Sequence, residues 1–286
     1  MRIANIAGRL GLLAANGHAV DVEQASAGRF SADPQAVYDR WEEFRAWARA
    51  VDLSGAAPFD QADLGSPAPA PRQVVAIGLN YREHAAESGF DVPDQLPPTF
   101  TKFPSCITGP FGEVVLPAGG HTDWEVELVA VIGTQAKDVT ETDAWSHVAG
   151  LAVGQDLSER ITQLQGPAPQ FGLGKSFPRF GPVGPWLVTP DELPNPDDLE
   201  LGCSINGEQM QKGRTGDLVC SVPSLIARLS SVITLLPGDV LFTGTPAGVG
   251  LGRDPQRWLA PGDELVSYAE GIGELRHRFI PAPTAA

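Results

Sequence analysis

The sequence is poor in cysteine, in positive charge and in long apolar runs, and each shortage disfavours a class of protein. Cys106, Cys203 and Cys220 are far apart and form no CxxC pair, which argues against a disulfide scaffold or a structural zinc site. Lys and Arg number 20 against 35 Asp and Glu, so the net charge of −15 disfavours nucleic-acid binding. No apolar stretch approaches the roughly 18 residues that a membrane span needs. With an N-terminus that lacks a convincing signal-cleavage site, these features predict a cytoplasmic protein that binds neither nucleic acid nor membrane.

The 286 residues do contain enough apolar material for a large core, interrupted by many turns. Hydrophobic residues make up 42% of the chain, and 32 glycines and 26 prolines divide it into short segments. This combination predicts a mainly β protein with some α (the α+β class) rather than a helical bundle. A proline-rich stretch ending in SPAPAP predicts a small N-terminal domain with its linker, residues 1–70, followed by a main body, residues 71–286.

Turn and helix signals outline several elements. Asp33 and Pro34 are typical of a helix start, and apolar residues spaced three and four apart predict one helix that continues to Val51. Buried strands are predicted over residues 74–79, 125–133 and 148–156, an Asn-Gly hairpin at 206–207, and a helix over residues 221–235. A short strand at 239–243 leads into a Gly-rich loop, residues 244–250.

Two glutamates carry the strongest chemical signal. In a strand, Glu125 and Glu127 point to the same side. Two like charges aimed into an apolar interior are costly unless a cation lies between them, and a hard divalent ion such as Mg²⁺ prefers oxygen ligands. A solvated strand face is the alternative, but the apolar residues 128–132 leave little room for one. Asp156, at the end of another predicted strand, is a candidate third ligand.

Cationic and amide side chains follow these carboxylates. Arg160 and Gln163 are three residues apart and would share a helix face, suited to a carboxylate substrate; a plain helix cap with a surface arginine is the alternative. Lys175 lies in a Gly-Lys-Ser sequence, but a P-loop needs glycine where Pro169 stands, so nucleotide binding is rejected. Lys175 is instead a candidate for binding a carboxylate or stabilising an enolate.

A His–Glu pair is the candidate acid–base group. His84 and Glu87 lie three residues apart on a predicted short helix over residues 81–88. Glu87 would hold one imidazole nitrogen and leave the other to take a proton from water; an exposed helical pair is the plainer alternative. Covalent serine or cysteine catalysis is disfavoured, because the chain has no GxSxG motif and no cysteine in a nucleophile setting.

Together these motifs resemble those of the fumarylacetoacetate hydrolase family. The matching segments are Gly78-Leu79-Asn80-Tyr81 with His84 and Glu87, Glu125-Val126-Glu127-Leu128, Asp156 with Arg160 and Gln163, Gly174-Lys175-Ser176-Phe177, and Thr243-Gly244-Thr245-Pro246-Ala247-Gly248-Val249-Gly250. They cover roughly residues 74–280 in the family's order. One position departs from the pattern, since Ile161 follows Arg160 where family members often have Asp.

The resemblance implies a fold, an assembly and a metal. The implied fold is a mixed β-sandwich roll, with residues 1–70 as a small α+β appendage, and the implied assembly is a homodimer. The implied cofactor is Mg²⁺ or Mn²⁺, held by Glu125, Glu127 and Asp156.

The resemblance also implies roles for the remaining site residues. His84, oriented by Glu87, would activate a water that attacks the distal carbonyl of the substrate. Lys175, with the metal, would hold the enolate of the departing pyruvate. The residues expected to position the substrate are Arg160, Gln163 and Thr245.

The activity expected from these roles is metal-dependent hydrolysis of a C–C bond in a 2,4-dioxo acid of the acylpyruvate or fumarylpyruvate type, giving pyruvate and a carboxylic acid. Decarboxylation of an oxaloacetate-type 3-oxo acid would need the metal and the enolate stabiliser but no attacking water. Isomerisation of a 2-hydroxy-dienoate would need only an acid–base group. A non-catalytic protein on this fold is disfavoured, because it has no use for so many charged groups together. The acyl group of the substrate is left open.

Overall fold

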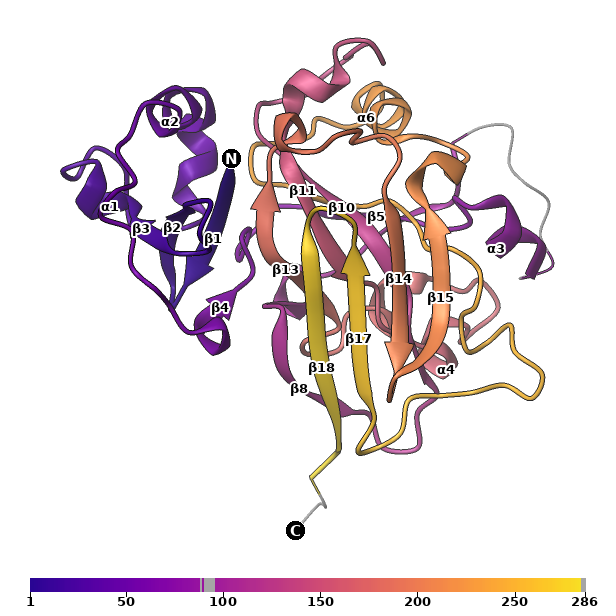
Figure 1. The fold of residues 1–286 in the computed structure, drawn as a ribbon. Helices are drawn as coiled ribbons and strands as arrows, with labels where there is room; N and C mark the ends of the chain where they lie inside the picture. The colour runs from indigo at the N-terminus through magenta and orange to yellow at the C-terminus, as the bar shows by residue number, and fades with distance from the viewer. Residues whose placement is uncertain (88, 90–95, 284–286) are drawn as a thin grey trace.

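Two β-sheets packed face to face form the body of the protein (Figure 1). The computed structural model describes residues 1–87, 89 and 96–283. The last residue of the helix predicted over 81–88 and most of the loop at 89–98 lie outside the described residues. The strand-rich body with a few short helices confirms the predicted α+β class and the mixed β-sandwich roll.

The larger sheet runs from the N-terminal residues to the carboxylates. Its 11 strands follow the order β3-β2-β1-β13-β11-β10-β16-β5-β6, with β4 beside β1 and β7 beside β13. The pairs β16–β5 and β13–β7 are parallel, and the others are antiparallel. The bounds are β1 Arg2–Ile6, β2 Arg9–Leu13, β3 Ala19–Asp21, β4 Leu64–Gly65, β5 Val74–Ile77, β6 Thr99–Thr101, β7 Ile107–Thr108, β10 Val126–Ile132, β11 Val148–Gln155, β13 Gly181–Val188 and β16 Val240–Phe242.

The second sheet covers one face of the first. Its five strands have the order β15-β14-β17-β18-β8, and β14, β17 and β18 pack on β10, β11 and β13. A two-stranded ribbon, β12 with β9, stands apart from both sheets. The bounds are β8 Phe111–Leu116, β9 Thr122–Asp123, β12 Ser158–Glu159, β14 Glu200–Ile205, β15 Glu208–Arg214, β17 Glu264–Ala269 and β18 Gly273–Pro281.

The helices are short and follow or precede strands. The longest α-helix among the described residues, α6, begins after Ser221, whose hydroxyl accepts a hydrogen bond from the Ser224 amide. No helix among the described residues is long and apolar enough to cross a membrane. The α-helices are α1 Val22–Ala25, α2 Trp41–Ala48, α3 Arg82–Glu87, α4 Arg160–Gln163, α5 Phe171–Gly174 and α6 Val222–Ser230. The 3₁₀ helices are η1 Ala36–Arg40, η2 Gln61–Asp63, η3 Pro104–Cys106, η4 Ala144–His147, η5 Pro190–Glu192 and η6 Thr215–Asp217.

Strand β10 is buried on both faces and separates two cores. Leu128, Ala130 and Ile132 belong to the core between the sheets. Val129 and Val131 belong to the core on the other side of the larger sheet. Side chains alternate along a strand, so Glu125 and Glu127 begin the same row as Val129 and Val131. Since both faces exclude water, these carboxylates must find their partners inside the protein.

The first 70 residues are joined to the body by strand pairing. β1 pairs antiparallel with β13, where Ile3 lies opposite Leu187. Within the predicted linker, β4 pairs with β1, and apolar residues from both parts form one core. In Figure 1 this N-terminal part is drawn in indigo and lies beside β13. A domain boundary at residue 70 stays a prediction from the sequence.

Two of the predicted helices have different bounds in the structure. The helix predicted from Asp33 to Val51 is instead η1 followed by α2, because Arg40 leaves the helical conformation at φ −131° and ψ 34°. The helix predicted over 221–235 ends at Ser230, and Leu235 instead pairs with Ala136 in an isolated β-bridge. The Asn206-Gly207 hairpin is confirmed: it joins β14 to β15, with φ values of 52° and 83°.

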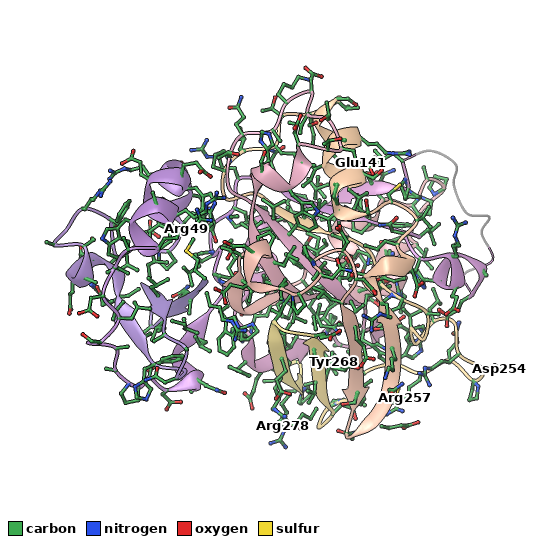
Figure 2. The ribbon with its side chains drawn as sticks, turned by 45° about the horizontal axis from the view of Figure 1, so that its top comes forward. Arg49, Glu141, Asp254, Arg257, Tyr268 and Arg278 are labelled. Atoms are coloured by element: carbon green, nitrogen blue, oxygen red, sulfur yellow. The ribbon has the colours of Figure 1, made fainter. Side chains whose placement is uncertain are left out.

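The outer surface carries charged side chains that pair with one another. Figure 2 draws Arg49 and Arg257 on the outside of the molecule, where they lie 3.2 Å from Asp191 and 2.8 Å from Glu208. Exposed ion pairs of this kind contribute little to stability. The two apolar cores, rather than these pairs, therefore hold the fold together.

Candidate metal and substrate site

Three carboxylates meet where β10 begins and β11 ends. The two strands are antiparallel with Val126 opposite Gln155, and the Asp156 amide donates to the Glu125 carbonyl over 2.9 Å. This pairing brings Asp156 beside Glu125 and Glu127. One carboxylate oxygen of each lies within 4.8 Å of the other two, and all three residues are buried.

Two lysines face these carboxylates and differ in the number of N–H donors that remain unpaired. Lys175 Nζ donates to Glu125 Oε2 over 2.7 Å and to Asp156 Oδ2 over 2.6 Å. Lys102 Nζ donates to Asp156 Oδ1 over 2.6 Å and to the carbonyls of Lys175 and Phe180. An ammonium has three N–H donors, so Lys102 has none left and Lys175 keeps one. Of the two, Lys175 is therefore the one that can bind a ligand.

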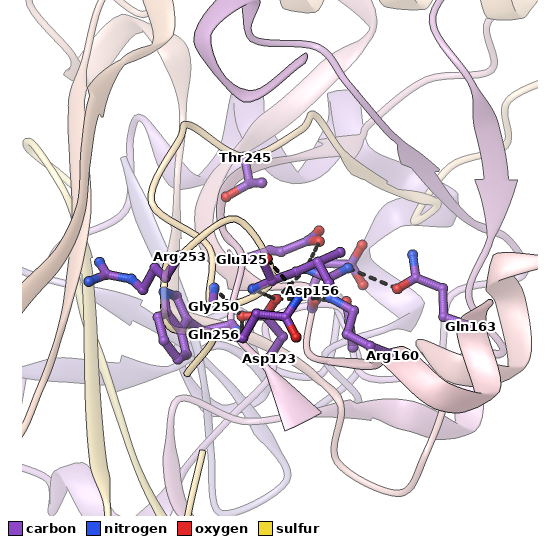
Figure 3. Close-up of polar contacts among 12 residues, drawn as sticks. Asp123, Glu125, Asp156, Arg160, Gln163, Thr245, Gly250, Arg253 and Gln256 are labelled. Atoms are coloured by element: carbon purple, nitrogen blue, oxygen red, sulfur yellow. Dashed lines mark hydrogen bonds and ion pairs between the residues drawn. The ribbon is translucent and has the colours of Figure 1, made fainter. Parts of the chain in front are cut away.

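Arg160 is held in place by Asp123 and keeps one donor. Its Nε and Nη2 donate to Asp123 Oδ2 over 2.9 and 2.7 Å, and Nη2 also lies 2.8 Å from Glu125 Oε1. Its Nη1 donates to Gln163 Oε1 over 2.8 Å (Figure 3). Four of the five guanidinium N–H groups are thereby engaged. The last Nη1–H, and the amide NH₂ that Gln163 must present on its other side, have no partner within the described chain.

Glu127 is the carboxylate without a cationic partner. Its Oε2 accepts from the Gly244 amide over 2.7 Å, and it forms no ion pair with any residue that the structure describes. Burial, together with Asp156 and Glu125, raises the pKa of Glu127 well above its ordinary range. Burial would also raise the pKa of Glu125, but Lys175 and Arg160 outweigh it and lower that pKa to about 2.

This charge distribution fits a divalent cation. With Asp123 included, four buried carboxylates face three cationic side chains, and the uncompensated charge lies at Glu127. The three clustered carboxylates offer only hard oxygen ligands, which suit Mg²⁺ or Mn²⁺. The acidic triad can therefore hold such an ion.

The His–Glu pair lies at the same cavity. His84 Nδ1 is 3.3 Å from Glu87 Oε2, and both Glu87 oxygens accept from the Gly248 amide at 3.1 Å. Because Nδ1 faces Glu87, Nε2 is left for a ligand or water. Gly252 packs so closely here that an added Cβ would lie 2.5 Å from Glu87 Cδ.

A cavity of about 550 Å³ collects most of the predicted residues. Those that line it are His84, Glu87, Glu125, Arg160, Gln163, Lys175 and Thr245. Glu127 and Asp156 lie buried beside Glu125, behind this lining. The Thr245 hydroxyl donates to the Val126 carbonyl over 2.9 Å, and Figure 3 draws Thr245 apart from the carboxylate cluster. The structure thus brings the predicted set together; the individual roles stay predictions.

The family model described as "Fumarylacetoacetate (FAA) hydrolase C-terminal" matches residues 73–280. The chain belongs to the fumarylacetoacetate hydrolase family. The resemblance inferred from the motifs is therefore confirmed, and the chain is a member of a family of enzymes.

Relatives within this family carry several activities. The human mitochondrial oxaloacetate tautomerase is 42% identical over 224 residues, which are 78% of this chain and 71% of that protein. A solved protein from Mycobacterium smegmatis, provisionally named HpcE, is 54% identical with a TM-score of 0.93, and the match covers 99% of this chain and 100% of that one. The maleylpyruvate hydrolase of Sphingobium sp. SYK-6, solved with manganese and pyruvate, is 29% identical with a TM-score of 0.81, covering 99% and 100%.

Two residues of this family site were missed from the sequence. Asp123 binds Arg160 and also accepts from the amides of Gly250 and Leu251 over 2.6 and 2.9 Å, which ties α4 to the Gly-rich loop. Its position two residues before Glu125 was a usable signal. Lys102 lies in no recognisable pattern.

The family's usual Asp after Arg160 is replaced by Ile161, whose side chain is exposed. Asp123, in β9, accepts hydrogen bonds from Nε and Nη2 of Arg160. The replacement therefore leaves the described contacts of the arginine intact.

Proposed function

We propose that the protein is a divalent-metal-dependent hydrolase that cleaves a C–C bond in a 2,4-dioxo acid, of the acylpyruvate or fumarylpyruvate type. The products are pyruvate and a carboxylic acid. The observation that carries the proposal is one cavity lined both by a His–Glu pair and by uncommitted donors beside a carboxylate triad. The likeness to a maleylpyruvate hydrolase solved with manganese and pyruvate supports it.

The proposed metal is Mg²⁺ or Mn²⁺, with Glu125, Glu127 and Asp156 as its ligands. When bound, the ion supplies Lewis-acid polarisation of the oxo-acid oxygens. Side chains of the protein bind the substrate and transfer the protons.

Substrate binding uses donors that the protein leaves unpaired. The free Nη1–H of Arg160 and the amide NH₂ of Gln163 lie three residues apart on α4 and bind the substrate carboxylate. Lys175 has one N–H beyond its two carboxylate partners and donates it to the oxygen on which the enolate charge develops. These donors orient the substrate with its distal carbonyl toward His84.

Proton transfer is assigned to the His–Glu pair. His84 Nε2 takes a proton from water as the oxygen of that water attacks the distal carbonyl, and Glu87 stabilises the imidazolium through Nδ1–H. The C–C bond then breaks, the acyl fragment leaves as a carboxylic acid, and the electron pair forms the pyruvate enolate. Protonation of that enolate gives pyruvate and restores neutral His84.

Enol–keto isomerisation of an oxaloacetate-type acid is the second candidate. It is favoured by the 42% identity to an oxaloacetate tautomerase. This reaction would use His84 to move a proton between carbon and oxygen, with no attacking water. A homodimeric assembly and a cytoplasmic location complete the proposal and rest on the sequence predictions alone.

The test is pyruvate release from acetylpyruvate with Mg²⁺ or Mn²⁺, repeated with a chelator. We expect metal-dependent pyruvate with equimolar acetate, and a loss of at least about 100-fold in kcat for His84→Ala. His84→Ala should still bind Mn²⁺, and His18→Ala, a histidine outside the cavity, should behave as wild type. Oxaloacetate interconversion without pyruvate release would favour the tautomerase, and release of CO₂ from oxaloacetate would favour a decarboxylase.

A further inference from the structure

Beyond its charged end, the cavity is apolar. Its apolar lining includes Leu79, Phe100, Leu164, Phe171, Val249 and Leu251. Phe100 and Phe171 meet edge to face, with ring centroids 5.5 Å apart and an interplanar angle of 68°. The Lys175 ammonium lies 5.1 Å from the Phe100 ring centroid, so this aromatic wall begins directly beside the charged end. The half-exposed Leu164 continues the wall to the surface.

The donors at the charged end suffice for one carboxylate only. The remaining N–H of Lys175 is assigned to the enolate oxygen, so the free Nη1–H of Arg160 and the NH₂ of Gln163 are left for a carboxylate. The Thr245 hydroxyl already donates to a backbone carbonyl. No other Lys or Arg lines the described part of the cavity, and the sequence of residues 88–95, SGFDVPDQ, contains none.

A second carboxylate on the acyl group would therefore lie against apolar side chains without a cation. Removing a carboxylate from water without pairing it is strongly unfavourable. An alkyl or aryl acyl group would instead bury apolar surface against the same wall, which is favourable.

We propose that the substrate of this chain carries a single carboxylate and an uncharged, apolar acyl group. The inference rests on the proposed hydrolase function and specifies its acyl group. It distinguishes this chain from its structural neighbour, a maleylpyruvate hydrolase, whose named substrate has a second carboxylate at the acyl end.

A matched pair of substrates tests the proposal. Butanoylpyruvate and succinylpyruvate differ only in the end of the acyl chain, which is a methyl group in the first and a carboxylate in the second. With Mn²⁺ present, kcat/KM for pyruvate release should be about 100-fold higher for butanoylpyruvate. A preference below about tenfold, with pyruvate released, would overturn the acyl assignment and leave the hydrolase intact. If neither substrate releases pyruvate, the hydrolase proposal itself is refuted.

Two half-exposed residues provide the matched variants: Ile161 in the first turn of α4, and Leu164 directly after its last residue. Leu164 lines the cavity, whereas Ile161 does not, and their exposed fractions are 50% and 51%. Leu164→Arg should raise kcat/KM for succinylpyruvate about tenfold and lower it for butanoylpyruvate, because it adds a cation to the wall. Ile161→Arg should change neither. Equal effects of the two substitutions, or no effect of Leu164→Arg, would contradict the assignment of this wall to the acyl group.

Discussion

Glu127→Gln should stabilise the metal-free protein and weaken its metal site. The carboxylate oxygens of the triad lie within 4.8 Å of one another. At that distance and an effective dielectric constant of about 20, each pair of like charges costs about 3 kcal/mol. Asp156 and Glu125 both repel an ionised Glu127, whereas Lys175 attracts it. The attraction offsets about one of the two repulsions, so the net cost is roughly that of one pair of like charges. Glutamine keeps the shape and removes the charge.

The sign of the effect follows from the pKa of Glu127. Since burial and the neighbouring carboxylates raise that pKa, the folded protein holds a proton where the unfolded chain has lost it. The free energy of unfolding therefore falls as pH rises above 4.5, and glutamine removes this loss. With a chelator present and at a pH above that value, we expect Glu127→Gln to be more stable than the wild type by up to about 3 kcal/mol.

Metal should reduce the stability advantage of the variant. At about 100 times its Kd, a metal ion adds about 2.7 kcal/mol to the free energy of unfolding of the wild type, and less to a variant that lacks one ligand. Urea unfolding at pH 7.5, in chelator and in Mn²⁺, measures both effects. Glu113→Gln, at an exposed position of β8, is the matched control and should change neither. Destabilisation of the metal-free variant, or an equal gain from Mn²⁺ in both proteins, would refute the reasoning.

Three further predictions concern side chains around the site and in the core. Gly252→Ala should lower kcat at least about tenfold, because its Cβ would lie 2.5 Å from Glu87 Cδ and displace the carboxylate that orients the base. Gly55→Ala, with open space around its Cβ, is the control, and equal kinetics of the two variants would count against this positioning. Lys102→Met should cost about 3–5 kcal/mol in chelator by urea unfolding, because buried Asp156 loses one of its two cationic partners and the carbonyls of Lys175 and Phe180 lose a donor; a loss below about 1 kcal/mol would contradict the ion pair. Burial lowers the pKa of His277 to about 4, so protonation favours the unfolded chain as pH falls from 6.5. Unfolding at pH 7 and pH 4 should reveal a loss of about 3 kcal/mol that His277→Gln removes; an equal loss in both proteins would exclude His277 as its source.

Features that depend on neighbouring residues were predictable from the sequence. The two-residue spacing of Glu125 and Glu127 is a property of one strand, and the Asn206-Gly207 turn needs only two residues with positive φ. Asp156 was a candidate because it ends another predicted strand, and the antiparallel pairing of β10 and β11 brings it beside the two glutamates. Each of these signals lies within a short segment or in a known combination of segments.

Features that depend on distant parts of the chain were not predictable in this way. Lys102 binds Asp156 across 54 residues of sequence, and no periodicity marks a lysine that will be fully enclosed. α6 ends at Ser230, and Leu235 pairs with Ala136 in a β-bridge rather than continuing the helix. Tertiary contacts override local propensity at both places.

The pairing of β1 with β13 gives the first 70 residues a part in supporting the site. Removing them would leave the Leu187–Val188 end of β13 without its partner strand, although the other end would still pair with β7. It would also uncover the core that contains Val129 and Val131, in the same row as the metal-ligand candidate Glu127. A shortened chain that begins at the family-matched region would thus present an unpaired strand segment and an exposed apolar surface on the sheet that carries the candidate metal ligands. The N-terminal part thus shields from water the apolar face of the sheet on which Glu127 lies.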